Sequence, residues 1–338
     1  MEINLGKYFS FRRFVNSLKI LSSFCISIVI RKPILWGLPL SYSIEPTNHC
    51  NLQCPECPSG LGTLTRPLGT MNFEFFERLV EEISPSGFYL QLFFQGEPYI
   101  NKNLSKMILF AQKKKMYVSV STNGHLLNES NIDTILDSAP DKIIYSIDGL
   151  DEKTYQNYRV GGSFSKVDRN LRILSARKKA RKLNKPFIEL QFIVMKQNEH
   201  LLNEVINYGK ETGVNKVIFK TMQVTSYENA VHFLPISEKY RRYQLENSSF
   251  RLKGKIKNHC FALWRTSVVT WDGKVVPCCF DKDAEFELGM LNGKTFNEIW
   301  KSDTYRDFRR KILLGRNNVN MCSNCTAGMK MNILEVEQ

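Results

Sequence analysis

The sequence predicts an α/β fold, in which an open (β/α)6 partial barrel is followed by a small α+β domain. Six short apolar segments between residues 40 and 250 alternate with helical patterns, which is typical of a parallel sheet with right-handed crossovers. Six units are too few for a closed barrel of eight strands. The 338 residues suit one large domain with a smaller one. We therefore expect an amino-terminal extension at 1–39, a barrel at 40–250 and a second domain at 251–338.

The individual elements are predicted from apolar periodicity and from capping residues. The six expected strands are Leu40–Glu45, Phe88–Phe94, Tyr117–Val120, Lys142–Ile147, Phe187–Val194 and Val214–Lys220. Between them, the expected helices include Phe73–Ile83, Leu104–Lys114, Phe164–Leu183 and Leu201–Thr212. Asn72 is the expected cap of the first of these helices. A connector at 221–250 is expected to end in a helix around Glu238–Glu246.

Residues 1–39 carry apolar side chains at near-helical spacing, with basic residues beside them. The apolar run from Ile20 to Ile30 has eleven residues, whereas a bilayer span needs about 20. A small-residue cleavage site of the kind that ends a signal peptide is lacking. Two alternatives remain: the helix packs on the main domain, or it lies in a membrane interface, anchored by basic residues and Trp36. Cys25 is expected to be a buried thiol of this helix.

The chain has a net charge of +14, and a basic segment at 164–185 supplies much of it. We expect this segment to be the solvated face of an outer helix. No RNA-binding signature accompanies the charge, so nucleic acid is not an expected partner. Nine cysteines without a clear secretory signal indicate metal ligands in a reducing cytosol rather than disulfides. The expected location is therefore cytoplasmic, with membrane association through residues 1–39 as an addition to it.

Cys50, Cys54 and Cys57 have the spacing Cys-x3-Cys-x2-Cys, directly after the first expected strand. Three thiolates in one short loop repel one another unless a cation or an iron–sulfur cluster neutralises them. Three ligands for a cluster of four irons leave one iron open to bind another molecule. One alternative is a structural zinc site with His49 as its fourth ligand. A disulfide framework is a weaker alternative, because it requires an even number of cysteines and a secreted chain.

Further polar residues follow the other expected strands, at the sheet end where parallel α/β folds bind ligands. Gln95-Gly96-Glu97-Pro98 follows the second strand, Ser121-Thr122-Asn123-Gly124 follows the third, and Ser146-Ile147-Asp148-Gly149 ends the fourth. Gln191 lies in the fifth strand. Each of these motifs alone is weak evidence for a binding site, because Asn-Gly and Asp-Gly are ordinary turn residues. Their joint placement around the cysteine loop is a much stronger indication of a binding site.

A second group of cysteines lies in the expected carboxyl-terminal domain, and its members are Cys260, Cys278, Cys322 and Cys325. Asp272-Gly273 predicts a two-residue hairpin turn between strands at 267–271 and 274–277, which would bring the first two of these cysteines to one end. A helix is expected at Phe296–Ile312. The last two cysteines have the two-residue gap of a metal-binding knuckle. Cys279 is an alternative ligand to Cys278. For the whole group, a structural zinc ion is an alternative to an iron–sulfur cluster.

The stretch from Cys50 to Cys57 resembles the signature of the radical S-adenosylmethionine (SAM) enzymes, which bind a [4Fe-4S] cluster through Cys-x3-Cys-x2-Cys. The residue before the third cysteine is usually apolar or aromatic in that family and is Glu56 here. This departure weakens a packing contact with adenine but leaves the cluster ligands in place. Gln95-Gly96-Glu97-Pro98 resembles the family's Gly-Gly-Glu-Pro, whose backbone and Glu hold the methionine amine of SAM.

The resemblance assigns further polar residues to SAM. Ser146 and Asp148 resemble the segment that meets the ribose and the methionine carboxylate, and Asn123 is expected to reach the nucleoside. Arg159 is expected to pair with the SAM carboxylate, with a solvated arginine as the alternative. His49 is expected to pack beside the cluster rather than to bind it. The complete expected SAM set is Gln95, Gly96, Glu97, Ser121, Asn123, Ser146, Asp148, Arg159 and Gln191.

The later cysteines resemble the auxiliary-cluster domain called SPASM, in its shortened form called Twitch. The full form binds two clusters and has more cysteines after the Cys-x2-Cys, whereas the thirteen residues that follow Cys325 contain none. The resemblance therefore implies one auxiliary [4Fe-4S] cluster, ligated by Cys260, Cys278, Cys322 and Cys325. A cluster with every iron ligated can accept or relay electrons, which favours net oxidation of a substrate.

The implied reaction is reductive cleavage of SAM to a 5′-deoxyadenosyl radical, which abstracts hydrogen from the substrate. The arrangement with a single auxiliary cluster resembles that of the inosamine dehydrogenase of aminoglycoside biosynthesis, which oxidises an alcohol. We therefore expect the substrate to be a small-molecule alcohol: a sugar, a cyclitol or a lipid-linked hydroxyl. An electron donor such as flavodoxin or ferredoxin is the expected protein partner. One alternative is a peptide or protein maturase that crosslinks or epimerises its partner. The other is a non-catalytic zinc or iron–sulfur scaffold.

Overall fold

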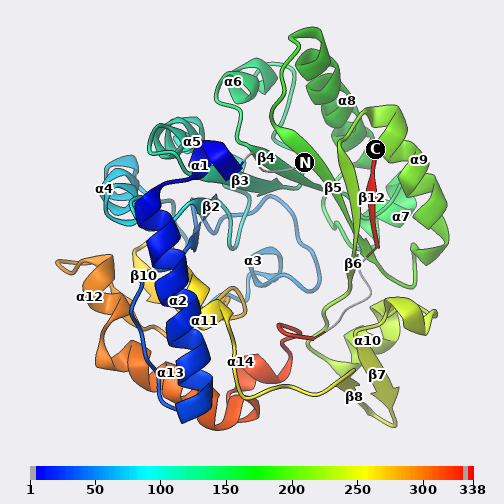
Figure 1. Ribbon diagram of the computed structural model, residues 1–338. Helices are drawn as coiled ribbons and strands as arrows, with labels where there is room; N and C mark the ends of the chain where they lie inside the picture. Colours follow the sequence, from blue (N-terminus) through cyan, green and yellow to red (C-terminus); the bar gives the residue numbers. More distant parts are fainter. Residues whose placement is uncertain (1–4, 330–333) are drawn as a thin grey trace. The chain divides into compact units, whose positions relative to one another are not determined.

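The computed structural model describes residues 5–329 and 334–338, and it divides into two compact units (Figure 1). The first unit comprises the described residues up to His49, together with Leu64–Ser119 and Ile256–Met329. The second unit comprises Cys50–Thr63, Val120–Lys255 and the described residues from 334 onward. Strands alternate with helices along the chain, as predicted. The domain boundaries expected at 39/40 and 250/251 stay predictions.

The sheet of the first unit has the strand order β11-β10-β9-β1-β2-β3. The strands are β1 (Ser41–Ile44), β2 (Tyr89–Gln91), β3 (Tyr117–Thr122, whose last three residues belong to the second unit), β9 (Thr266–Val269), β10 (Lys274–Val276) and β11 (Gly289–Met290). β1 pairs in parallel with β2 and with β9, and β2 pairs in parallel with β3. β10 runs antiparallel to β9 and to β11. The sequence predicts the parallel order of the first three strands but not the pairing of β9 with β1.

The helical elements of the first unit are α1 (Leu5–Tyr8), α2 (Phe11–Ile30), α4 (Phe73–Ile83), η1 (Pro98–Ile100), α5 (Leu104–Lys113), α11 (Ala262–Arg265), α12 (Phe296–Trp300), α13 (Asp303–Gly315), η4 (Arg316–Asn318) and α14 (Asn320–Ser323). α4 has the predicted bounds, and Asn72 caps it by accepting a hydrogen bond from the backbone nitrogen of Phe75. The prediction of one helix over 296–312 is wrong. Ser302 separates α12 from α13, because its side chain accepts from the backbone nitrogen of Tyr305 and begins a new helix.

The predicted hairpin between β9 and β10 is present, but its turn is longer than the expected Asp-Gly pair. Val275 pairs with Val269, and the backbone nitrogen of Gly273 donates to the carbonyl of Thr270 at 3.0 Å. The two central residues of the turn are therefore Trp271 and Asp272. Gly273 follows them at a φ of 90°, a conformation that favours glycine and lets a longer hairpin loop close.

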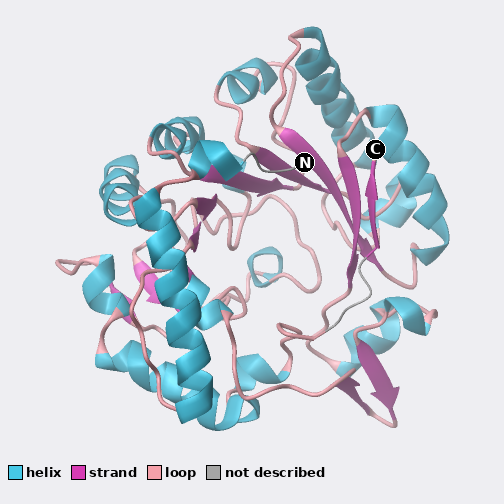
Figure 2. Cartoon of the chain, viewed as in Figure 1, coloured by secondary structure: helices cyan, strands magenta, loops and turns pink. Residues whose placement is uncertain are grey.

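The sheet of the second unit has the strand order β4-β5-β6-β12. β4 (Lys142–Ser146), β5 (Phe187–Val194) and β6 (Lys216–Thr221) are parallel, as predicted, and β12 (Leu334–Glu337) is antiparallel to β6. The other elements of this unit are α3 (Pro58–Leu61), α6 (Ile132–Asp137), α7 (Glu152–Gln156), α8 (Phe164–Ala180), η2 (Glu199–Leu201), α9 (Leu202–Thr212), α10 (Tyr227–Phe233), η3 (Glu238–Tyr240), β7 (Tyr243–Glu246) and β8 (Ser249–Leu252). Figure 2 shows α8 and α9 covering one face of these parallel strands.

The helix predicted around Glu238–Glu246 is wrong. Only η3 is helical there, and it is a single turn, while Tyr243–Glu246 forms β7 and pairs antiparallel with β8. Ser248 lies at a φ of 62° between the two strands. The short turn lets the backbone pair locally, and this pairing competes successfully with a helix.

The basic segment on α8 faces outward, as predicted. Val167, Leu171 and Leu174 of this helix are buried, and the arginines lie on its other side. Arg177 pairs with Asp133 at 2.7 Å and Arg181 pairs with Asp137 at 2.6 Å. Because these pairs are exposed, they add little stability.

α2 packs on the first unit through the ring of Phe24, whose centroid lies 4.8 Å from that of Phe261 and 5.2 Å from that of Trp264. The expectation that Cys25 is buried is wrong, because its side chain is exposed. By length and composition α2 is also apolar enough to cross a membrane, and about a third of its most apolar window is buried in the protein. A helix that packs on a soluble domain passes the same test of composition.

Candidate functional site

The first three cysteines lie on the loop after β1, within the segment Cys50–Thr63 of the second unit. Cys54 is buried, and Cys50 and Cys57 are half-buried. The loop is tight, because the backbone nitrogen of Cys57 donates to the carbonyl of Cys54 at 3.1 Å. A Cβ on Gly60 would lie only 2.6 Å from the backbone nitrogen of Cys54. This close packing holds the three thiols on one compact turn.

Side chains and backbone from elsewhere in the second unit hold the cysteine loop in place. Asn123 follows β3, and its Nδ2 donates to Oδ1 of Asn51 at 2.9 Å. The Oδ1 of Asn123 accepts from the backbone nitrogen of His125 at 3.0 Å. The backbone nitrogen of Gln53 donates to the carbonyl of Val160 at 2.9 Å. The amide of Asn123, predicted to reach a nucleoside, is therefore also a support of the cysteine loop.

Glu56, the departure from the family pattern, has a partner within the second unit. Its side chain is 8% exposed, and its Oε2 accepts from Oγ1 of Thr225 at 2.9 Å. The backbone nitrogen of Thr225 points at the other carboxylate oxygen, 3.4 Å away. Sequence reasoning identified the departure but not its partner, because Thr225 lies 169 residues further along the chain. The contact ties the cysteine loop to the segment after β6.

Asp148 and Arg159 form a buried ion pair in the second unit. The Nε of Arg159 donates to Oδ2 of Asp148 at 2.6 Å, and Oδ1 of Asp148 accepts from the backbone nitrogen of Ile193 at 2.7 Å. Burial raises the pKa of Asp148, and the guanidinium of Arg159 opposes that shift. The side chain of Arg159 is 12% exposed, so the alternative of a solvated arginine is wrong.

The guanidinium of Arg159 also acts on the first cysteine group. Burial raises the pKa of the Cys54 thiol, Arg159 lowers it, and the nearby Cys57 raises it. A thiol must lose its proton to bind a metal or a cluster. The positive charge of Arg159 favours that loss, so the Asp148–Arg159 pair fits a site that holds anionic sulfur.

Of the other predicted residues of the second unit, Ser121 lies near the end of β3, Ser146 ends β4 and Gln191 lies within β5. Ser146, the last residue of β4, stands directly opposite Gln191 in the β4–β5 register. Partners in register on neighbouring strands share one face of the sheet, so these two side chains lie on the same face. Ser146 is buried, whereas Gln191 and Ser121 are half-buried.

The predicted Gln95–Pro98 motif belongs to the first unit and packs on the residues that precede Cys50. Gly96 has a φ of 75°, and a Cβ there would lie 2.6 Å from the carbonyl oxygen of His49. The backbone nitrogen of Glu97 donates to the same carbonyl at 2.8 Å. Gln95 and Glu97 are both buried, and the side chain of His49 is exposed. The positive φ and the close carbonyl oxygen mean that only glycine fits at position 96.

The second cysteine group lies within the first unit, and its thiols influence one another. Burial raises the pKa of Cys278 well above its usual range, and Cys279, Cys325 and Cys260 raise it further. Burial raises the pKa of Cys322 to about 11, Arg316 lowers it, and Cys325 raises it. The side chain of Cys279 is exposed, whereas that of Cys278 is half-buried, and the competition between the two as ligands stays a prediction.

Arg316 is a candidate functional residue that sequence reasoning missed. It is 2% exposed, and its Nη1 donates to the carbonyl of Ala327 at 3.0 Å. Burial lowers its pKa, but Cys260, Cys325 and Cys322 together raise it above the usual value. Its Nε and Nη2 are buried without a hydrogen-bond partner among the described residues. Cationic donors beside these thiols suit a negatively charged thiolate cluster. A single arginine before a cysteine pair carries no signal in the sequence.

The structure contains no preformed site for a single metal ion among the residues that it describes. Within residues 5–329 and 334–338, no group of three or more His, Cys, Asp or Glu side chains is close enough to hold one metal ion. Zinc draws its ligands to about 2.0–2.3 Å. In a four-iron cluster each cysteine thiolate binds a different iron, so the cysteine sulfur atoms lie further apart than they do around a single zinc ion. The choice between clusters and zinc at these residues, including the zinc site that uses His49, stays a prediction.

Two families match the chain. Residues 44–208 match the radical SAM superfamily, and residues 260–326 match SPASM, an iron–sulfur cluster-binding domain. The chain is 23% identical over 297 residues to the tungsten-containing aldehyde ferredoxin oxidoreductase cofactor-modifying protein of Pyrococcus furiosus, covering 79% of this chain and 82% of that protein. It is 24% identical over 291 residues to the PqqA peptide cyclase of Rhodopseudomonas palustris, covering 79% of this chain and 74% of that protein.

A solved structure shows the same fold. The chain resembles BtrN in complex with AdoMet and 2-DOIA with a TM-score of 0.55 and 18% identity, covering 88% of this chain and 96% of that chain. The likeness confirms the predicted partial barrel with a small carboxyl-terminal domain. The families also carry the predicted cofactors, which are a [4Fe-4S] cluster, an auxiliary cluster and SAM. The chain therefore belongs to the radical SAM superfamily and is a radical SAM enzyme with a SPASM domain.

Proposed function

We propose that this enzyme oxidises a small alcohol, such as a sugar, a cyclitol or a lipid-linked hydroxyl. One observation carries the proposal. Within Ile256–Met329 the charges of Cys260 and Cys325 act on both Cys278 and Arg316, and that of Cys322 acts on Arg316, which supports a single auxiliary cluster with every iron ligated. Such a cluster has no open iron site to which a substrate could bind, but it can accept an electron. The aligned region also spans 96% of the BtrN chain but only 74% of the peptide cyclase, so this chain matches BtrN over more of its length.

Residues of the second unit would hold the reactive centre. We assign the first cluster to Cys50, Cys54 and Cys57. When bound, this cluster supplies the electron that splits SAM into methionine and a 5′-deoxyadenosyl radical, and the auxiliary cluster supplies an acceptor for the electron that the substrate gives up. The substrate carbinol then loses one hydrogen atom, one proton and one electron to become a ketone.

The side chains around the first cluster would position SAM. We assign SAM contacts in the second unit to Ser121, Asn123, Ser146, Asp148, Arg159 and Gln191, and in the first unit to Gln95, Gly96 and Glu97. Asp148 accepts from the Nε of Arg159, and the guanidinium also acts on the Cys54 thiol; we propose that it pairs with the carboxylate of SAM as well.

The decisive experiment is anaerobic reconstitution followed by SAM and dithionite. We expect about eight iron atoms per chain, from two four-iron clusters, and formation of 5′-deoxyadenosine. Cys54→Ala should abolish SAM cleavage, whereas Cys25→Ala, at an exposed thiol outside both groups, should leave it unchanged. An alcohol deuterated at the carbinol carbon should transfer deuterium to 5′-deoxyadenosine. Zinc with no cleavage product would contradict the assignment.

A second candidate function is peptide maturation. It is favoured by the 24% identity to a PqqA peptide cyclase. The two candidates differ in the molecule that gives up hydrogen, so deuterium transfer from a peptide but from no alcohol would select the maturase. For either function we propose flavodoxin or ferredoxin as the electron donor and a cytoplasmic location.

A further inference from the structure

The face of α2 that packs on the rest of the first unit is largely polar, and the face that is exposed to solvent is apolar. Its buried residues are Arg13, Asn16, Ile20, Ser23, Phe24 and Ser27. Its exposed large apolar residues, with their exposed fractions, are Phe11 75%, Phe14 48%, Leu18 49%, Leu21 51%, Ile26 37%, Val29 82% and Ile30 45%. A helix that covers a protein core shows the reverse arrangement. The apolar face is therefore not what attaches α2 to the protein.

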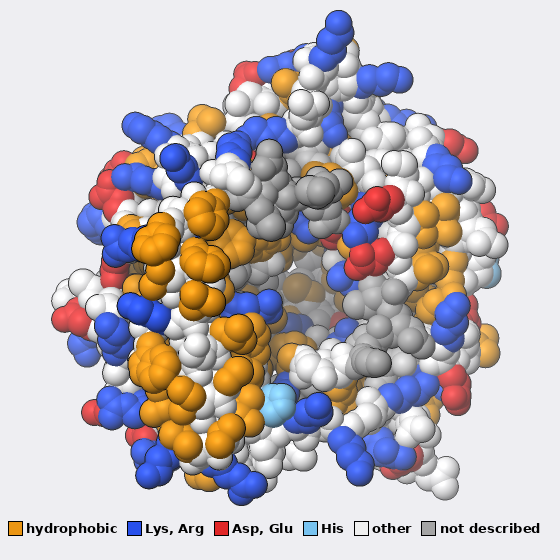
Figure 3. All heavy atoms as spheres, viewed as in Figure 1, with side chains coloured by type: hydrophobic (Ala, Val, Ile, Leu, Met, Phe, Trp, Pro, Cys, Tyr) orange, Lys and Arg blue, Asp and Glu red, His pale blue; other side chains and the backbone are white. Residues whose placement is uncertain are grey.

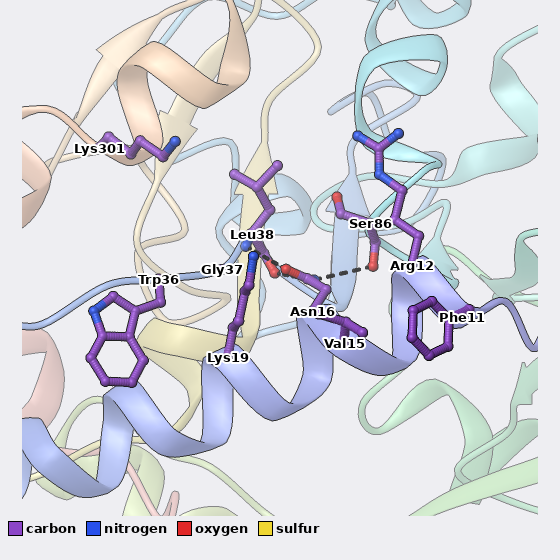
Figure 4. Close-up of a pocket in the computed structure, with 10 residues that line it drawn as sticks. All are labelled: Phe11, Arg12, Val15, Asn16, Lys19, Trp36, Gly37, Leu38, Ser86 and Lys301. Carbon is purple, nitrogen blue, oxygen red and sulfur yellow. Dashed lines mark hydrogen bonds between the residues drawn. The ribbon is translucent and has the colours of Figure 1, made fainter.

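Polar contacts, together with the packing of Phe24, hold α2 on the rest of the first unit. The guanidinium of Arg13 donates to the backbone carbonyls of Tyr8, Ser84, Lys114 and Lys115 at 2.6–3.2 Å. Ser84 and Lys114 are the carboxyl-terminal caps of α4 and α5, where the helix dipole favours a cation. The side chain of Asn16 accepts from the backbone nitrogen of Leu38 and donates to its carbonyl (Figure 4).

The exposed apolar residues form one stripe along α2. With about 3.6 residues per turn, Phe11, Leu18 and Val29 lie on one line, and Phe14 and Leu21 lie beside it. Figure 3 shows this stripe as a column of apolar side chains over α2 with basic side chains around it. Of the eighteen large apolar residues exposed in the described part of the chain, nine lie between residues 9 and 36. The stripe is thus the main concentration of exposed apolar residues.

Basic residues flank one side of the stripe. Arg12 and Lys19 of α2 and Lys301 line a groove of about 340 Å³ together with Phe11 and Trp36 (Figure 4). α2 itself has neither Asp nor Glu. An apolar stripe with cations and a tryptophan at its edge is the pattern of helices that lie in the interface of an anionic bilayer.

We propose that α2 docks this enzyme on an anionic membrane surface, with the apolar stripe among the acyl chains and lipid phosphates held by Arg12, Lys19 and Lys301. α2 is convex and carries large side chains in a single row, so it suits a fluid layer. The net charge of +14 attracts the same surface over a longer range. Pairing with a second copy along the same face would bring Arg12 and Lys19 near their own counterparts, and like charges oppose that contact.

The test is co-sedimentation of the reconstituted full-length enzyme with phosphatidylcholine vesicles, with and without phosphatidylglycerol. We expect binding only to the anionic vesicles, weakened by salt. Leu18→Asp and Leu21→Asp should each lower the partition coefficient roughly tenfold or more, the order expected for one leucine side chain. Leu109→Asp, on α5 and exposed to the same 51% as Leu21, is the matched control and should bind as the parent does.

A second measurement separates the outcomes. Arg12→Glu with Lys19→Glu should remove the preference for anionic vesicles, while SAM cleavage in solution stays unchanged. Trp36 is 53% exposed, so its fluorescence should shift to the blue on binding, and Trp36→Phe should remove that shift. Failure of the parent enzyme to bind anionic vesicles would overturn the proposal. So would an equal loss in Leu109→Asp, or a stripe variant that changes only the oligomeric state.

Discussion

Gly96 decides how closely the segment after β2 can approach the residues before Cys50. Its φ is 75°, and a Cβ at this position would lie 2.6 Å from the carbonyl oxygen of His49, which leaves no room for a side chain. Gly96→Ala should destabilise the protein by about 1–3 kcal/mol and lower the iron content. Gly62→Ala is the control, because Gly62 has a φ of 67° but nothing within 4 Å. Urea unfolding and iron assays compare the two, and equal losses would contradict the steric explanation.

Arg316 offers a test of the second cysteine group. Arg316→Met removes the charge beside Cys260, Cys322 and Cys325, so we expect loss of the auxiliary cluster, which is about half of the iron. SAM cleavage should persist. Arg316→Lys should retain part of the cluster, because it keeps the charge but not the planar donors. Arg310→Met, at an exposed arginine paired with Asp307, should keep all the iron. Iron and sulfide assays decide, and full iron in Arg316→Met would refute the role.

Single residues divide into those that the sequence predicts and those that it cannot. The cysteine spacing and Gly96 carry their own signal, because each depends on the backbone within a few residues. Glu56 with Thr225 and Arg316 with its cysteines depend on contacts that the fold makes between distant segments. Such contacts leave no local pattern.

Among the elements, α2 shows how a helix can be fixed by polar groups. The guanidinium of Arg13 meets four backbone carbonyls, whereas Arg12 is exposed. We expect Arg13→Met to lower the free energy of unfolding by about 3 kcal/mol, because it leaves buried carbonyls without a donor. Arg12→Met should change it by less than about 0.5 kcal/mol. Urea unfolding measures both, and similar values for the two variants would show that Arg13 does not anchor the helix.

Helix and strand predictions succeed where caps and periodicity agree. α4 begins after Asn72 and follows a clear apolar pattern, so its bounds are predicted in full. The break at Ser302 has a local signal, since serine is a favoured cap, but the apolar spacing runs across it and conceals it. At Tyr243–Glu246 the pairing with β8 overrides a weak helical pattern.

For the molecule as a whole, the two cysteine groups imply two separable roles. Cys322→Ala with Cys325→Ala should still yield 5′-deoxyadenosine, because the first cluster keeps its ligands, but the rate should fall and the substrate oxidation should not be completed. The measurement is the ratio of oxidised product to 5′-deoxyadenosine under anaerobic conditions. A ratio that matches the parent enzyme would contradict the proposed electron acceptor.

The parallel order of the strands follows from the alternation in the sequence, but the pairing of β9 with β1 does not. These strands lie far apart in the sequence, at Ser41–Ile44 and Thr266–Val269. A local pattern cannot specify which strand edge a distant hairpin will join. The edge is selected by the hydrogen bonds that remain unpaired once β1 and β2 are formed.

The position of β9 beside β1 has a consequence for biosynthesis. Glu45, which directly follows β1, accepts hydrogen bonds from Arg66 and from the backbone nitrogen of Trp271 in the β9–β10 hairpin. Until the ribosome has released that hairpin, a nascent chain has Arg66 but lacks the second donor to this buried carboxylate, the backbone nitrogen of Trp271. The carboxylate at the end of β1 would therefore gain its full set of donors only after the β9–β10 hairpin has left the ribosome.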